Sequence, residues 1–135
     1  MHEQTVIGFD YGSKRIGIAV GQTLTKTARA LTQISNDATP EWSKLDTLIA
    51  EWRPKTLIVG LPLNMDDSIG HAADSAKKFA QQLQQRYHLP THLIDERLSS
   101  REARTRLQQQ GKRQPDKQAI NSMAAQIILE DWLHK

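Results

Sequence analysis

The sequence contains no cysteine among its 135 residues. This absence excludes disulfide bonds, thiolate zinc sites and a cysteine nucleophile, and it is compatible with a cytosolic protein. The sequence also has no apolar run long enough to span a bilayer, and residues 1–4 show no signal-peptide pattern. We therefore expect a cytoplasmic protein that does not use a membrane as a partner.

Charge is nearly balanced overall, with a formal net charge of only +3, but it is distributed unevenly. Residues 97–117 hold seven basic and two acidic side chains, so this segment is positive and the remainder is slightly negative. A basic cluster of this kind attracts phosphate backbones through counterion release. A solvated helix face followed by a loop is the alternative interpretation of the same run.

The apolar pattern alternates between strand-like and helix-like periods, which is typical of one α/β domain over residues 1–135. Three consecutive strands, an antiparallel meander, are predicted first, and Thr39 and Pro40 then suit the cap and first position of a helix that ends before Pro54. The predicted strands cover residues 5–10, 15–21, 28–34, 57–60 and 91–96, and the later helices cover residues 70–87, 99–107 and 117–133. This order predicts a ribonuclease H-like fold, a five-stranded mixed sheet with a three-strand meander, two parallel strands and helices on both faces. In such a fold the first and fourth strands run side by side.

Carboxylates stand at the ends of two of these strands. Asp10 ends the first apolar run, and Asp95 and Glu96 end the last one. A divalent metal needs hard oxygen ligands that converge from separate parts of a chain. Consecutive strand residues point to opposite faces, so only one of Asp95 and Glu96 can share a face with Asp10, and the sequence leaves open which one.

A third ligand is expected from the final helix, which packs near the first strand in such folds. Asn121 lies one turn before Ala124 and Ala125, small residues that let a helix approach a sheet closely. Asp116 is five residues earlier, about 140° around a helix, so it cannot simply replace a group at position 121 unless the helix starts later.

Four ordered motifs carry a resemblance to a known family. They are GFDYGSKRIG at 8–17, VGLPLNMD at 59–66, DERLS at 95–99 and AAQIIL at 124–129. With them the chain resembles the YqgF family, the Holliday-junction-resolvase-like proteins also called RuvX, over essentially its full length. The resemblance implies a ribonuclease H-like fold and a nuclease of pre-16S ribosomal RNA 5′-end maturation that uses Mg²⁺ or Mn²⁺, with Holliday junction resolution as the alternative activity.

The resemblance also implies site residues. The family's first acid falls on Asp10 and its second on Glu96, but its third acid falls on Asn121. An amide oxygen can ligate a hard cation but brings no negative charge, so metal affinity should drop. Asp67 replaces a glycine often found there and, like Asp116, is a carboxylate that could compensate. A nucleic-acid-binding homologue with weakened catalysis is therefore a second hypothesis.

Basic side chains around these motifs are expected to hold backbone phosphates, which position a strand without reading its bases. The expected contacts are Lys14, Arg15, Arg97, Arg101, Arg104, Lys112 and Arg113. The expected partner is pre-rRNA or branched DNA, bound by a monomer or a weak homodimer. An actin-like kinase or ATPase, a third hypothesis, would need two such domains and a second glycine-rich phosphate loop, which the sequence lacks. Trp42 and Trp52 are expected to be core anchors rather than base-stacking platforms.

Overall fold

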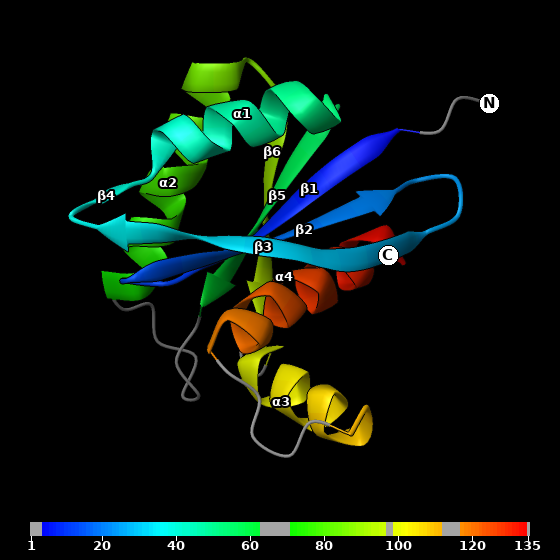
Figure 1. Ribbon diagram of the computed structural model, residues 1–135. Coiled ribbons are helices and arrows are strands. Elements are labelled where there is room, and N and C mark those ends of the chain that lie inside the picture. The colour runs from blue at the N-terminus through cyan, green and yellow to red at the C-terminus, as the bar shows by residue number, and fades with distance from the viewer. Residues whose placement is uncertain (1–3, 63–70, 97–98, 112–116, 135) are drawn as a thin grey trace.

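A computed structural model describes residues 4–62, 71–96, 99–111 and 117–134. Its centre is a six-stranded sheet with helices on both faces (Figure 1). Helices α1 and α2 cover one face, α4 crosses the other, and α3 packs on α4 on the side away from the sheet. The helices are α1 (Trp42–Trp52), α2 (His71–Tyr87), α3 (Ser99–Gln109) and α4 (Lys117–Leu133). In the described residues no helix is long and apolar enough to cross a membrane.

The strand order is β4-β3-β2-β1-β5-β6. The strands are β1 (Thr5–Tyr11), β2 (Arg15–Gln22), β3 (Thr27–Asp37), β4 (Thr39–Pro40), β5 (Thr56–Pro62) and β6 (Thr91–Glu96). Strands β1, β2 and β3 form the antiparallel meander, while β5 and β6 run parallel to β1. The predicted ribonuclease H-like arrangement is therefore confirmed, including the pairing of the first strand with the strand through residues 57–60.

The sixth strand, β4, corrects the predicted start of the first helix. Thr39 and Pro40 pair with the end of β3 instead of capping α1, which begins only at Trp42. The physical reason is a tertiary contact that overrides the local helix preference. The Oε1 atom of Glu41 accepts hydrogen bonds from the backbone N and the Oγ of Ser35, both at 3.1 Å. With Ala38 in the left-handed region (φ 66°), these bonds close a tight hairpin before the helix can start.

The core between the sheet and helices α1 and α2 is aromatic. Phe79 of α2 contacts the ring of Phe9 at 5.5 Å between centroids and that of Trp42 at 5.8 Å. Trp42 and Trp52 are partly buried against this cluster, as the prediction of core anchors requires. Burial of such rings supplies much of the area that stabilises a small domain.

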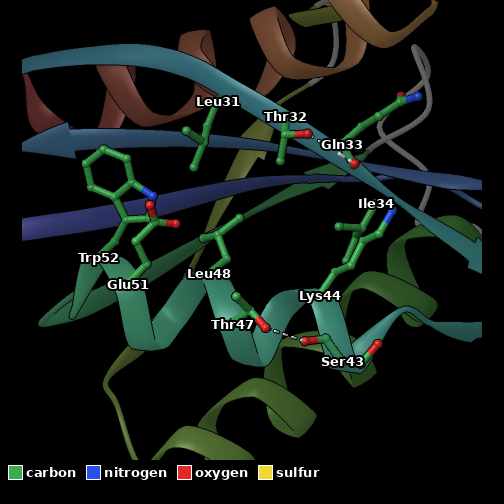
Figure 2. Close-up of a pocket in the computed structure, with 10 residues that line it drawn as sticks. All are labelled: Leu31, Thr32, Gln33, Ile34, Ser43, Lys44, Thr47, Leu48, Glu51 and Trp52. Carbon is green, nitrogen blue, oxygen red and sulfur yellow. Dashed lines mark hydrogen bonds between the residues drawn. The ribbon is translucent and has the colours of Figure 1, made fainter.

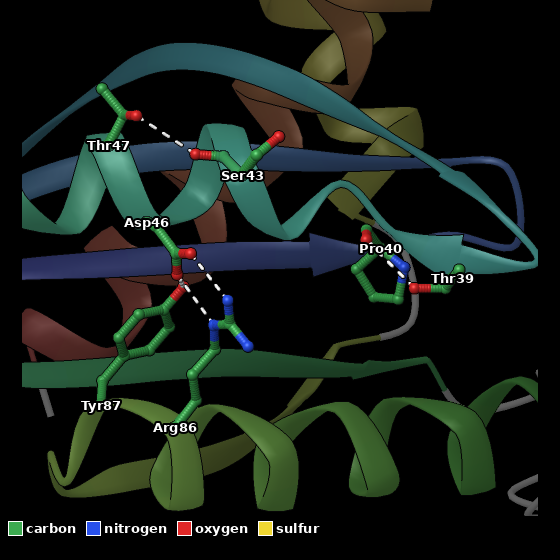
Figure 3. A network of polar contacts seen from close by, with 7 residues as sticks. All are labelled: Thr39, Pro40, Ser43, Asp46, Thr47, Arg86 and Tyr87. Atoms are coloured by element: carbon green, nitrogen blue, oxygen red, sulfur yellow. Dashed lines mark hydrogen bonds and ion pairs between the residues drawn. The ribbon is translucent and has the colours of Figure 1, made fainter.

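A polar cluster joins α1 to α2 at the surface (Figure 3). Asp46 of α1 accepts hydrogen bonds from Arg86 at 2.8 and 2.7 Å and from the Tyr87 hydroxyl at 2.6 Å. The Arg86 guanidinium also lies 5.0 Å from the centre of the Trp42 ring. The hydrogen bonds from Arg86 and Tyr87 lower the pKa of Asp46 to about 2.

Candidate active site

Asp10 lies near the end of β1, in a row of residues that crosses five strands. In the pairing register Asp10 stands opposite Gly17 of β2 and beside Gly60 of β5. Gln33 of β3 pairs with Gly17, and Ile94 of β6 pairs with Gly60. Asp10 is thus flanked on both neighbouring strands by residues without side chains.

The two glycines let α4 approach the sheet closely. A Cβ atom on Gly17 would overlap the backbone oxygen of Asn121, and one on Gly60 would overlap the side chain of Ile128. Because paired residues of neighbouring strands face the same way, Asp10 lies on the α4 face of the sheet. Val6 lies four residues before Asp10 on β1 and therefore on the same face of the strand. It packs in the same cluster as Ile128 of α4, which agrees with this assignment.

The carboxylate of Asp10 is poorly solvated. Its residue is half-buried, and this burial raises its pKa to about 6. From the residues that the structure describes, it receives neither a hydrogen bond nor an ion pair. A half-buried carboxylate that is ionised at neutral pH without a partner is suited to bind a cation.

Glu96 is the last residue of β6, and its side chain lies outside the described part of the structure. The residues before it on β6 show which face of the sheet Asp95 occupies. The His92 ring stacks on Trp132 of α4 at 6.1 Å, and Ile94 packs in the cluster that α4 forms with the sheet. Alternation along β6 then places the exposed Asp95 on the face opposite to α4, and a ligand role for Glu96 stays a prediction.

Asn121 sits in the second turn of α4, directly over Gly17. Its backbone thus lies against β2, the strand that pairs with β1. Its Nδ2 donates a hydrogen bond of 2.9 Å to Oε1 of Gln33 on β3. Sequence reasoning did not anticipate Gln33, since a polar residue on a strand near the sheet edge gives no signal.

Acidic residues do not otherwise gather here. Among the described residues, no group of three or more histidines, aspartates or glutamates could hold a metal ion. Asp67 and Asp116, the carboxylates that could compensate for Asn121, lie outside the described ranges. The described part of the site therefore offers one carboxylate, that of Asp10, and one amide, that of Asn121, while Glu96 ends β6 opposite Pro62.

The turn after Asp10 holds two of the expected phosphate contacts. Lys14 and Arg15 are both exposed. The turn is fixed by Asn36, which is only 5% exposed. The Nδ2 atom of Asn36 donates to the carbonyl oxygen of Gly12 at 2.8 Å, and its backbone N donates to the carbonyl oxygen of Lys14 at 2.9 Å. Asn36 is a second residue that the sequence did not reveal, because its role depends on a contact 24 positions away.

Helix α3 carries the basic segment, and one of its arginines is already neutralised. Arg106 donates to Glu130 of α4 at 2.7 Å and to Glu102 at 3.2 Å, so it ties α3 to α4. It is therefore not available to a phosphate in the way that an unpaired arginine would be. The side chains of the other expected contacts, Arg97, Arg101, Arg104, Lys112 and Arg113, lie outside the described part of the structure.

The chain is similar to known proteins in family, in sequence and in structure. A family model described as "RuvX: Holliday junction resolvase" matches residues 4–135. A Legionella pneumophila protein named "Putative pre-16S rRNA nuclease" is 48% identical over 131 residues, covering 96% of this chain and 94% of that protein. A Proteus mirabilis protein of the same name is 45% identical over 137 residues, covering 100% and 99%.

Among solved structures, Thermus thermophilus RuvC in complex with a Holliday junction substrate aligns with a TM-score of 0.58 at 14% identity, over 97% of this chain and 94% of that chain. The fowlpox virus Holliday junction resolvase aligns with a TM-score of 0.54 at 13% identity, over 96% and 98%. At these identities the likeness shows the ribonuclease H-like fold and no more. The family match and the two bacterial relatives, which align over almost their whole length, show that the chain belongs to the RuvX (YqgF) family of Holliday-junction-resolvase-like proteins.

Proposed function

We propose that this protein is a metal-dependent nuclease that hydrolyses phosphodiester bonds in the 5′-end processing of pre-16S ribosomal RNA. The observation that carries the proposal is the half-buried carboxylate of Asp10, placed on the face that α4 approaches through Gly17 and Gly60. The names of the relatives support the choice of substrate. A cytoplasmic location and a monomer or weak homodimer belong to the same proposal.

Asp10, Glu96 and Asn121 would hold Mg²⁺ or Mn²⁺. A bound ion of this kind lowers the pKa of its water and stabilises the attacking and leaving oxygens of the phosphodiester. Asp10 gives a negative charge whose hydration is reduced by burial, and Asn121 gives a neutral oxygen. Because the proton competes with the cation for Asp10, we expect cation binding to strengthen as the pH rises through about 6.

Lys14 and Arg15 would bind backbone phosphates of the substrate strand. They project from a turn that Asn36 holds rigidly, a few residues beyond Asp10. The basic residues Arg97, Arg101, Arg104, Lys112 and Arg113 would extend this contact along and beyond α3. Phosphate contacts position the strand but do not choose its sequence, so both RNA and DNA substrates fit this chemistry.

Two alternatives rest on specific observations. The description of the family and the RuvC-like fold favour a branched-DNA endonuclease as the second candidate. The amide at position 121 favours a binding protein with weakened catalysis as the third, because the site loses one negative charge relative to three carboxylates.

One set of cleavage assays separates these functions. Wild-type protein and Asn121→Asp are incubated with 5′-extended pre-16S RNA and with a four-way DNA junction, each with Mg²⁺ and with Mn²⁺. The proposal expects wild-type cleavage of the RNA near the mature 5′ end, with Asn121→Asp faster. Cleavage of the junction alone would replace RNA processing with the resolvase function. Binding without cleavage by the wild type, with activity only in Asn121→Asp, would establish the binding protein.

A further inference from the structure

Among the described residues, the side chain of Asn121 has one hydrogen-bond partner. Its Nδ2 donates to Oε1 of Gln33 at 2.9 Å. Gln33 pairs with Gly17 on the side of that glycine opposite to Asp10. Because the Asn121 backbone lies over Gly17, the residue stands between Gln33 on β3 and Asp10 on β1.

The orientation of this amide decides which of its atoms faces the site. A side-chain amide is planar, its nitrogen and its oxygen diverge from the same Cγ atom, and only the oxygen can bind a hard cation. The bond to Gln33 directs Nδ2 toward β3. Oδ1 is thus left without a bond to Gln33, and Asp10 lies on the other side of Gly17 from Gln33.

Gln33 is itself well placed to impose this orientation. It lies on β3 between a β-bulge and the buried Asn36. At the bulge, the register of β3 with β2 shifts between Ile18 and Ala19. Figure 2 shows the groove between β3 and α1, which Gln33 helps to line. The side-chain amide of Gln33 points away from α1 in this view. The side chain is thus directed to the opposite face of the sheet, where α4 lies.

We infer that Gln33 is a positioning residue of the candidate site, which binds Nδ2 of Asn121 and so presents Oδ1 of that amide as an oxygen ligand. This inference rests on the proposed function. Without the bond, the amide can turn about its last torsion, which has two broad orientations, and present nitrogen as often as oxygen.

The test measures Mn²⁺ affinity by calorimetry on the full chain in a double-mutant cycle. Gln33→Met removes the acceptor while keeping a similar length, and it is made in the wild type and in Asn121→Ala. We expect Gln33→Met to weaken Mn²⁺ binding about five-fold in the wild type, the scale of one lost hydrogen bond, and to have no effect in Asn121→Ala. Gln33→Glu, which keeps an acceptor for Nδ2, serves as the second variant and should bind Mn²⁺ at least as tightly as the wild type.

The side-chain amide signals of Asn121 in a ¹⁵N-correlated NMR spectrum give a readout without metal. One Nδ2 proton should be shifted and protected from exchange in the wild type and in Gln33→Glu, and not in Gln33→Met. Equal weakening of Mn²⁺ binding in both backgrounds, no weakening in either, or an unprotected Nδ2 proton in the wild type would overturn the positioning role alone. Absence of Mn²⁺ binding by the wild type would overturn the proposed metal-dependent function and this role with it.

Discussion

At the scale of single residues, Asp10 serves the site at a cost to the fold. Burial raises its pKa from 3.8 to about 6, so the folded state disfavours the ionised form. Its contribution to stability is complete below pH 4 and is lost as the pH rises through 6. A shift of this size corresponds to about 3 kcal/mol, and partial exposure of the residue reduces that figure.

Asp10→Asn should therefore stabilise the protein at pH 7.5 by about 1–2 kcal/mol, because a neutral amide replaces a half-buried charge. Urea unfolding measures the free energy of unfolding at several pH values. The gain should be absent at pH 3.5 and constant above pH 7. Asp95→Asn is the matched control, because Asp95 is exposed on the opposite face of the sheet, and it should change stability little. A loss of stability in Asp10→Asn at pH 7.5 would contradict this account of the carboxylate.

The proposed phosphate contacts of Lys14 and Arg15 can be tested separately from the metal site. Replacing both with alanine should weaken binding of single-stranded RNA and lower the slope of log affinity against log salt by about 1.4, the value for two phosphate contacts. The control is the double variant Lys26→Ala with Arg53→Ala, which removes the same charge. Both cations are exposed and lie at the end of the sheet where β1 begins, away from Asp10. Equal effects of the two double variants would indicate a general field rather than local phosphate contacts.

At the scale of elements, the approach of α4 to the sheet depends on glycine. Gly17→Ala places a methyl group against the backbone oxygen of Asn121, which cannot rotate away. We expect a loss of about 2–3 kcal/mol in the free energy of unfolding, typical of overpacking, together with reduced cleavage because α4 must shift. Gly111→Ala is the comparison, since open space surrounds Gly111 and only its positive φ of 93° opposes a side chain, a cost of about 1 kcal/mol. Similar losses in both variants would argue against close packing as the reason for Gly17.

The junction of α1 and α2 should give the protein an acid-sensitive contact. Asp46→Asn removes the charge that Arg86 and Tyr87 bind and should lower the melting temperature at pH 7. The pKa of Asp46 is lowered to about 2, so its contribution is present above pH 4 and is lost as the pH falls toward 2. The difference in melting temperature between wild type and variant should shrink over that range. A difference that persists unchanged at pH 2 would show that the charge of Asp46 is not its source.

The main elements could be predicted from the sequence because their signals are local. Alternating apolar residues fix the meander, and the continuous apolar run through Ile58 fixes β5. β4 could not be predicted, since Thr39 and Pro40 are good helix-start residues and the bonds of Glu41 to Ser35 override them. The choice between Asp95 and Glu96 likewise needed the register of β6 against α4.

At the scale of the whole molecule, the sheet brings together residues that the sequence separates widely. Gln33, Gly17, Asp10 and Gly60 form one row across four strands, and Asn121 of α4 closes over it. Sequence reasoning could name Asp10, Glu96 and Asn121 because motifs mark them, and they stay predictions as ligands. Gln33 and Asn36 could not be named, because their partners are 88 and 24 residues away. The site is thus a product of strand register as much as of motif.

The central claim is that Asp10 is the anchor of a metal-dependent nuclease site. The most direct measurement compares the rates at which wild type, Asp10→Asn and Asp95→Asn cleave 5′-extended pre-16S RNA with Mn²⁺ at pH 7.5, after far-ultraviolet circular dichroism has shown that all three are folded. We predict cleavage by the wild type and by Asp95→Asn, and a loss of at least about a hundred-fold in Asp10→Asn, in which one ligand has lost its charge. Undiminished cleavage by folded Asp10→Asn would contradict the claim.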